Sequence, residues 1–494
     1  MICGLPKYDG LSRLSEDELR AIMPVKSGST PEALVDQGLR CIFLYAIQSC
    51  SSDVHISGSG GHDRMMVKIS VRTPGGLEKY TYEGQAGRQF MDKLFALTNT
   101  PQGGSTSPII STRFSIDLPA YFALGLGLSP QGDAPYALDV RVEYIRTYNG
   151  WKFVCRLLDQ QRRPKFDGLG LPATLASAIR NAIKRPSGLF LVSGPTGSGK
   201  STSMMAILDL LNDGTKAIST IEDPVEYRLL GPGPIAQIQV TREMTFPIAL
   251  RSVLRQDPEV IFVGEIRDEE TMRTALAAAQ TGHLVLATIH ANSAPETITR
   301  ALELTGSSDP RYAHVLADVL CFVAAQRLVN TYGGLPKRRD LQADEAAWLA
   351  VNGMGFMKLI DESVSDSVLG KLPLIEGIEI TPDIKALIRA QNLSSGGIYR
   401  LARDQPQFET LAMAGVRAVE SKGAKLRDCM AGLETTAEAQ EHPGLRLQAA
   451  RGHQTSLSAI SDAIDRQAAA FQKGAVVSLD DCIDTVAADA WEAA

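Results

Sequence analysis

The stretch GPTGSGKS, residues 194–201, constrains the fold of this 494-residue chain more than any other feature. It matches the phosphate-binding pattern GxxxxGKS/T at every defined position, between the apolar run GLFLV and a helical pattern that includes Met204, Ile207 and Leu211. A strand, a glycine-rich loop and a helix in this order direct backbone N–H groups and the positive end of the helix dipole at phosphate oxygens. The stretch therefore predicts a P-loop that binds a nucleoside triphosphate; an accidental glycine-rich turn is the alternative.

Each part of this loop has an expected task. Lys200 is expected to reach the outer phosphates, and the hydroxyl of Ser201 is expected to ligate Mg²⁺. ATP and Mg²⁺ are therefore the expected cofactors. The predicted binding residues of the loop are Gly194, Pro195, Thr196, Gly197, Ser198, Gly199, Lys200, Ser201 and Thr202.

The hydrophobic pattern divides the chain into regions. After a polar leader, 1–32, alternating segments such as MMVKISVR predict a small α+β domain over 33–160, followed by a basic, Pro- and Gly-containing linker, 161–172. Over 173–330, short apolar runs alternate with helical patterns, which predicts an α/β domain with a largely parallel sheet covered on both faces. A helical region, 331–434, and a helical extension of unknown role, 435–494, are expected to follow; the extension carries an apolar stripe at helical spacing.

Composition excludes several classes of function. The net charge of -6 argues against a general nucleic-acid binder, because the phosphate backbone favours an excess of Lys and Arg. The 7 cysteines are scattered and form no CxxC pair, which indicates reduced thiols in a cytosolic protein and no zinc site. Neither a signal peptide nor an apolar run long enough to cross a bilayer is visible, so any membrane role is expected to be peripheral.

Acidic residues follow two of the predicted strands. The stretch TIEDPVEYRL, residues 220–229, places Glu222, Asp223 and Glu226 close together, and EVIFVGE ends in Glu265. A solvated surface loop is one explanation and a catalytic edge the other. Ligands in open parallel sheets bind beyond the carboxyl ends of the strands, which favours the catalytic edge. His290 ends a further strand and is a candidate for the same site, together with His283.

These motifs together resemble those of the secretion and pilus motor ATPases, a family that includes pilus retraction and type II secretion motors. GPTGSGKST is similar to its Walker A motif, TIEDPVEY to its Asp box, residues 250–271 to its Walker B region and TGHLVLATIHANSA to its His box. SSDVHI and AAQRLV also follow the family pattern. The resemblance implies a RecA-like P-loop domain preceded by a small PAS-like α+β domain, in a hexameric ring that hydrolyses ATP.

The resemblance also implies roles for individual residues. Glu226, just before Tyr227, corresponds to the glutamate that positions or activates the attacking water, and Glu265 corresponds to the Walker B glutamate on the Mg²⁺ side. Arg267 is expected near the nucleotide, and a phosphate or inter-subunit contact is expected from one of four arginines. These are Arg156, Arg251, Arg255 and Arg267.

The chain also departs from the family. Extension and type II motors usually carry a tetracysteine zinc insertion after the QRL motif, whereas this chain has NTYGGLPKRRD there. It is therefore more similar to retraction motors and to the compact motors of conjugative thin-pilus or Dot/Icm-type systems. The implied partners are other copies of the chain and an inner-membrane platform protein, at the cytoplasmic face of a bacterial inner membrane. A nucleic-acid translocase and a non-enzymatic, nucleotide-gated scaffold are the alternatives.

Overall fold

The structure is a computed structural model that describes most of the chain between residues 31 and 433. The described ranges are 31–49, 51–61, 64–73, 76–84, 87–97, 109–118, 120–125, 136–159, 164–306 and 310–433. The predicted extension 435–494, with its apolar stripe, and nearly all of the leader 1–32 lie outside them. The chain divides into two compact units, one ending at Arg163 and the other beginning at Pro164. The domain limits given above stay a prediction.

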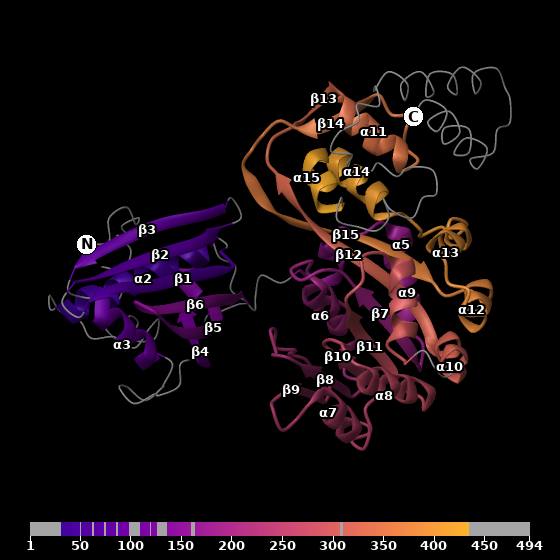
Figure 1. The fold of residues 1–494 in the computed structure, drawn as a ribbon, viewed down its shortest axis with the longest axis horizontal. Helices are drawn as coiled ribbons and strands as arrows, with labels where there is room; N and C mark the ends of the chain where they lie inside the picture. The colour runs from indigo at the N-terminus through magenta and orange to yellow at the C-terminus, as the bar shows by residue number, and fades with distance from the viewer. Residues whose placement is uncertain are drawn as a thin grey trace. The chain divides into compact units, whose positions relative to one another are not determined.

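The described part of the N-terminal unit is an antiparallel sheet with helices against it (Figure 1). Its strands follow the order β3-β2-β1-β6-β5-β4. Their bounds are β1 Asp53–Gly61, β2 Arg64–Thr73, β3 Gly76–Gly84, β4 Ile109–Leu118, β5 Tyr136–Thr147 and β6 Gly150–Asp159, and the helices are α2 Pro31–Gln48, α3 Gly87–Leu97 and α4 Ala120–Gly125. Alternate residues such as Val54 and Ile56 are buried among apolar side chains of α2 and α3. The predicted α+β fold of this unit is confirmed.

The second unit contains a largely parallel sheet with the order β15-β12-β7-β11-β10-β8-β9. Its strands are β7 Gly188–Ser193, β8 Ile218–Glu222, β9 Ile235–Gln239, β10 Val260–Val263, β11 Leu284–Ile289, β12 Leu320–Tyr332 and β15 Val368–Glu379. Only the β12–β15 pair among these described strands is antiparallel. The apolar runs predicted as parallel strands are therefore strands of one sheet.

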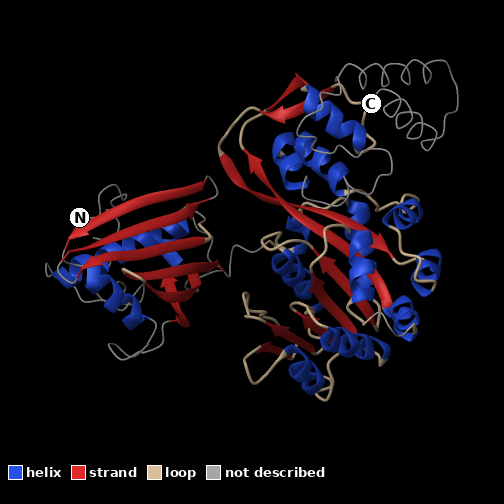
Figure 2. Cartoon of the chain, in the orientation of Figure 1, coloured by secondary structure: helices blue, strands red, loops and turns tan. Residues whose placement is uncertain are grey.

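Helices cover both faces of this sheet (Figure 2). Leu189 and Leu191 of β7 pack on the face covered by α7–α10, whereas Phe190 and Val192 pack on the face covered by η2, α5 and α6. The helices are η2 Phe166–Leu169, α5 Ala173–Ile183, α6 Lys200–Leu211, α7 Phe246–Val253, α8 Glu269–Gln280, α9 Ala294–Glu303 and α10 Arg311–Val319. Burial on both faces explains why these strands are continuous apolar runs without alternation.

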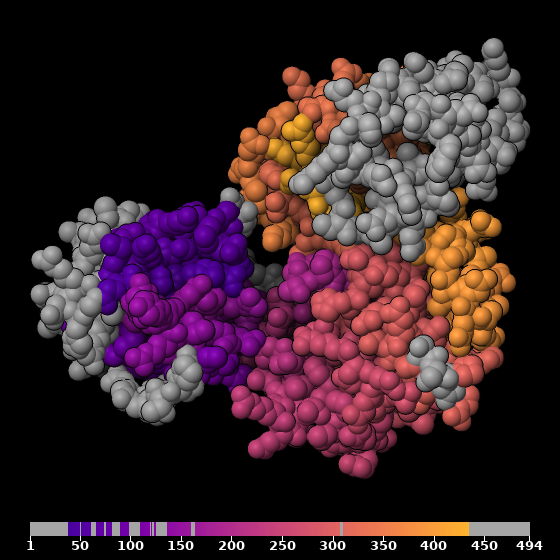
Figure 3. Space-filling view, viewed as in Figure 1, coloured from indigo at the N-terminus to yellow at the C-terminus, as the bar shows by residue number. Residues whose placement is uncertain are grey.

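The helices predicted after residue 330 are present, together with strands that the hydrophobic pattern did not predict. The helices are α11 Ala343–Val351, α12 Pro382–Arg389, α13 Ser395–Ala402, α14 Leu411–Lys422 and α15 Leu426–Leu433. Helices α12 and α13 lie beside each other and α12 packs on α10, forming the orange surface in Figure 3. Strand β15 returns to the main sheet, and β13 Pro336–Asp340 pairs with β14 Leu359–Ser363. Pairing with partners distant in sequence decides these strands, and local pattern does not record it.

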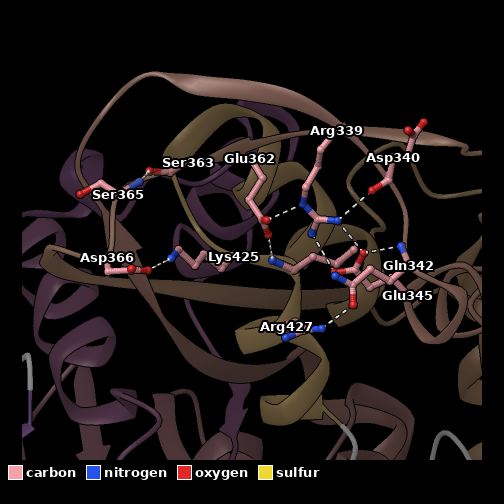
Figure 4. Close-up of polar contacts among 11 residues, drawn as sticks. Arg339, Asp340, Gln342, Glu345, Glu362, Ser363, Ser365, Asp366, Lys425 and Arg427 are labelled. Atoms are coloured by element: carbon pink, nitrogen blue, oxygen red, sulfur yellow. Dashed lines mark hydrogen bonds and ion pairs between the residues drawn. The ribbon is translucent and has the colours of Figure 1, made fainter.

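A cluster of charged side chains fastens β13 to its surroundings (Figure 4). Arg339 donates to both carboxylate oxygens of Glu345, at 2.6 and 2.7 Å, and to Glu362 at 2.8 Å. Glu345 also accepts the N–H of Gln342, the N-cap of α11, and Glu362 accepts the N–H of Leu426, which begins α15. Arg339 belongs to the stretch NTYGGLPKRRD, which contains no cysteine.

No helix in the described ranges is both long and apolar enough to span a lipid bilayer.

Candidate active site

The predicted site residues follow strands whose carboxyl ends share one edge of the sheet, called here the carboxyl edge. Strands β7, β8, β10 and β11 are parallel, and the paired residues Ser193 and Ile289, and Val263 and Ile221, set their ends level. The P-loop follows β7, the TIEDPVEY stretch ends β8, Glu265 follows β10, and His290 follows β11. Topology therefore brings these segments to one place, as expected for a ligand site in a parallel sheet.

The P-loop has the backbone conformation that its glycines permit. Gly194, Gly197 and Gly199 have φ angles of 150°, 81° and 82°, a region that residues with a side chain rarely adopt. A Cβ on Gly194 would overlap the carbonyl oxygen of Gln326 on β12. Gln326 is buried, and its side-chain amide donates to the carbonyl of Ser198 at 2.7 Å. Gln326 of strand β12 therefore contacts the P-loop through a hydrogen bond and close backbone packing.

Lys200 begins α6 and turns back over the loop. Its Nζ donates to the carbonyls of Gly194 at 2.7 Å and Pro195 at 3.1 Å. Burial lowers the pKa of Lys200; the carboxylate of Glu265 opposes this shift, and the guanidinium of Arg327 adds to it. The ammonium group thus lies among the residues expected to face phosphate, and a phosphate group would offer it a stronger partner than the two carbonyls.

The carboxylate of Glu265 lies between the guanidinium of Arg267 and the imidazole of His290. Arg267 donates to its Oε2 at 2.6 Å, and Nε2 of His290 lies 2.8 Å from its Oε1. Burial acts to raise the pKa of Glu265, but Arg267, His290 and Lys200 outweigh it, so the pKa lies below its usual value. The His290 contact is not aligned as a hydrogen bond, so that among the described residues the buried Oε1 accepts none. The carboxylate is ionised and keeps an open acceptor.

The carboxylates of the TIEDPVEY stretch differ in environment. Glu222 is only 4% exposed and accepts hydrogen bonds from the Thr220 hydroxyl at 2.6 Å and from Gln237 at 3.2 Å. Burial raises the pKa of Glu222, and the hydrogen bonds oppose that rise. Glu226 is half-buried, and Tyr227 beside it packs against the core that contains α6. Glu226 is near enough to Lys200 for its charge to affect the pKa of that lysine. Glu222 is thus an internal anchor and Glu226 a group at the site.

The structure does not bring every predicted residue to this edge. His283 precedes β11, at the opposite edge of the sheet, where its Nδ1 lies 3.0 Å from the carbonyl of Ala278. Arg251 pairs with Glu270, and Arg255 is exposed beyond α7. Arg156 belongs to the N-terminal unit and donates to Asp53 at 3.1 Å. Within the second unit, only Arg267 of the four arginine candidates contacts a predicted catalytic residue.

Sequence reasoning missed some residues that support the site. Arg327, in the AAQRLV motif, is buried and donates to the carbonyls of Gln326 and Asn292 at 3.1 and 2.8 Å, joining the P-loop support to the segment after His290. The resemblance of the AAQRLV motif to the family pattern implies no role for this arginine. Gln237 of β9 contacts the TIEDPVEY loop, and its position as a polar residue inside a short strand was the only available signal.

The residues at the carboxyl edge fit a Mg²⁺–nucleotide complex. A hydroxyl, Ser201, and an ionised carboxylate with an open buried oxygen, Glu265, are the hard oxygen ligands that Mg²⁺ prefers. The glycine conformations leave the backbone N–H groups of the loop available for phosphate.

A family model described as Type II/IV secretion system protein matches residues 133–431, more than half of the chain. The chain belongs to this family. It is 43% identical over 210 residues to the type II secretion system protein E of Pseudomonas aeruginosa, covering 42% of this chain and 40% of the relative. It is 38% identical over 300 residues to the type IV pilus assembly ATPase PilB of Acinetobacter baylyi, covering 57% of this chain and 49% of the relative.

Solved structures share the fold. The pilus retraction motor PilT with bound ADP matches with a TM-score of 0.56 and 26% identity, covering 79% of this chain and 95% of that one. The ATPase DotB of Legionella pneumophila matches with a TM-score of 0.58 and 19% identity, covering 83% and 97%. The chain spans only 40% to 61% of the length of the first curated relatives. The family and the fold are therefore shown.

Proposed function

We propose that this chain is an ATP hydrolase that converts hydrolysis into mechanical work for type IV pilus assembly or retraction, or for protein secretion. The observation that carries the proposal is the meeting of the P-loop, Glu265 and the Glu226 loop at the carboxyl edge of one sheet. Family membership and the names of the relatives support the same reaction.

The reaction follows from the residues present. The P-loop N–H groups and Lys200 bind and orient the outer phosphates, and Glu226 orients a water molecule and accepts its proton during attack on the terminal phosphorus. Ser201 and Glu265 would hold Mg²⁺, which when bound neutralises charge on the phosphate oxygens. Arg267 and His290 keep Glu265 ionised and fix its position. Arg156, Arg251 and Arg267 each pair with a carboxylate, and one of the four candidate arginines is proposed to supply a phosphate contact from a neighbouring subunit.

The biological setting is part of the proposal. The protein works as a hexameric ring in the cytoplasm, at the inner face of a bacterial inner membrane, and reaches the membrane through a platform protein of a pilus or secretion machine. A conjugative thin pilus is the preferred setting, with a retraction-type or Dot/Icm-type secretion motor as the alternative. Sedimentation of the purified protein with and without ATP tests the ring, and co-purification with the platform protein encoded nearby tests the partner.

The catalytic assignment is tested with Glu226→Gln. General-base catalysis contributes about 100-fold or more, so turnover should fall by at least that factor while ATP still binds. Glu243→Gln, an exposed glutamate in the turn before α7, is the matched control and should behave as the wild type. Unchanged turnover in Glu226→Gln would refute the role of Glu226. Tight ATP binding without phosphate release by the wild type would favour a scaffold, and stimulation of turnover by DNA would favour a translocase.

A further inference from the structure

We propose that Gln237 is a positioning residue that fixes the loop carrying Glu226, an inference that rests on the role proposed for Glu226. Gln237 lies on β9, the edge strand of the main sheet, and does not belong to any of the motifs described above. Its amide forms hydrogen bonds with the loop that follows β8 and with Glu222, the last residue of that strand.

One side chain makes contacts at two points of the loop. The Nε2 of Gln237 donates to the carbonyl of Tyr227 at 2.9 Å, and its Oε1 accepts the N–H of Leu229 at 2.8 Å. The side chain thus satisfies an acceptor and a donor in a backbone segment that lies outside the strands. Leu229 is buried, so the segment is anchored at that end by packing as well.

The same amide reaches the buried carboxylate at the other end of the loop. Nε2 of Gln237 lies 3.2 Å from Oε1 of Glu222, and the Glu222 carboxylate also accepts the backbone N–H of Glu226. The backbone at Glu226 is therefore tied to Glu222 on one side, while Gln237 holds Tyr227 and Leu229 on the other. Gln237 thus forms hydrogen bonds both with Glu222, before the loop, and with Tyr227 and Leu229.

Position is what a water-orienting carboxylate must supply. Displacement of a reacting group by about 1 Å can cost about 100-fold in rate without affecting how tightly a substrate binds. The phosphate-binding loop is held separately, by Gln326 and Arg327 of β12. Loss of the Gln237 contacts should therefore lower the rate of the chemical step and leave nucleotide binding unchanged.

The experiment compares Gln237→Met with Gln239→Met in the full-length protein. Methionine matches glutamine in length and removes both hydrogen-bonding atoms, and Gln239 lies on the same strand but is exposed. Gln237→Met is expected to lower kcat about 10-fold or more, with KM and the Kd of a fluorescent ATP analogue within about twofold of the wild type. Gln239→Met is expected to match the wild type in all three.

A second variant, Gln237→Glu, tests whether a loss of activity in Gln237→Met comes from the lost hydrogen bonds. Gln237→Glu keeps the acceptor for Leu229 and loses the donors to Glu222 and Tyr227, so it should also lose kcat with KM retained. Wild-type kcat in both Gln237 variants, or a rise in Kd with kcat unchanged, would overturn the proposal. Glu226→Gln separates the two levels. If that variant is inactive and Gln237→Met is fully active, only the positioning role fails; if Glu226→Gln is fully active, the catalytic assignment fails and the positioning role with it.

Discussion

Replacing Arg339 by methionine tests what holds β13 in place. The guanidinium bonds Glu345 through two nitrogens and Glu362 through a third, so one cation serves two carboxylates. The Glu345 side chain is 0% exposed, and that of Arg339 is 30% exposed. Arg339→Met keeps the aliphatic part of the side chain. Among the described residues, it leaves the buried Glu345 carboxylate with the N–H of Gln342 as its hydrogen-bond donor.

The magnitude follows from burial. Breaking a buried ion pair by removing one partner costs about 3–5 kcal/mol, because it leaves a buried charge uncompensated. Since Arg339 is partly exposed and water can replace some of its contacts, we expect a loss of about 2–3 kcal/mol in the free energy of unfolding. The unfolding entropy is about 2.1 cal/mol/K per residue, so for the second unit 1 kcal/mol corresponds to about 1.5 °C, and the melting midpoint should fall by roughly 4 °C.

The loss should depend on pH. In the wild type, burial acts to raise the pKa of Glu345, but Arg339 outweighs it and the pKa lies below its usual value. That contribution to stability is present above the unfolded-state pKa, about 4.3, and is lost as pH falls through the folded value. In Arg339→Met the pKa of Glu345 should instead rise above its unfolded value, so proton uptake favours the folded state. The difference in stability between Arg339→Met and the wild type should therefore be smaller at pH 5 than at pH 7.5.

Thermal unfolding of the full-length protein, followed by circular dichroism at both pH values, measures this difference. Arg338→Met is the matched control, because Arg338 is the neighbouring residue, pairs with Asp361 and is 69% exposed; it should leave the midpoint unchanged. An Arg339→Met midpoint within about 1 °C of the wild type at pH 7.5 would contradict the inference that Glu345 depends on this arginine.

Two further predictions concern the nucleotide site. Gly194→Ala should abolish ATP binding, because the added Cβ meets the Gln326 carbonyl and the φ of 150° disfavours alanine. Gly396→Ala should leave ATP binding intact, because no heavy atom lies within 4 Å of the added Cβ. Titration with a fluorescent ATP analogue measures both. His290→Ala should lower turnover by about 10-fold or more, because it removes the imidazole beside Glu265. His283→Ala should leave ATP affinity unchanged, because His283 contacts Ala278 at the opposite edge of the sheet. Wild-type turnover in His290→Ala would contradict the inference that His290 belongs to the active site.

Much of the second unit could be predicted from sequence because its strands are buried on both faces. Runs such as GLFLV and EVIFV have no alternation to misread, and the P-loop fixes the strand before it and the helix after it. Strand β15 was missed because it forms by pairing with β12, which the local pattern does not record. The same limit applies to Glu376 of β15, which is buried and accepts the N–H groups of Ala294 and Leu411 at the starts of α9 and α14.

The placement of site residues shows where a motif stops being informative. His283 and His290 belong to one motif and flank one strand, yet a six-residue strand separates its ends by about 20 Å, so they cannot share one site within a single chain. The sequence places His290 after the predicted strand and His283 before it, and the parallel pairing of β11 with β7 puts the end of that strand beside the P-loop. Chain direction, more than residue type, decides which of the two can reach Glu265.

The same reasoning separates Glu222 from Glu226, two carboxylates that lie four residues apart in the TIEDPVEY stretch. Glu222 is the last residue of β8 and points into the protein, where burial raises its pKa and three donors hold it in one orientation. A carboxylate whose lone pairs are already engaged is poorly suited to accept a proton from water, but well suited to fix a neighbouring backbone. Glu226 follows on the turn that Glu222 anchors, half-buried and within electrostatic reach of Lys200. The two acids are therefore parts of one arrangement, in which an internal carboxylate and Gln237 contact the loop that carries the carboxylate proposed to orient water.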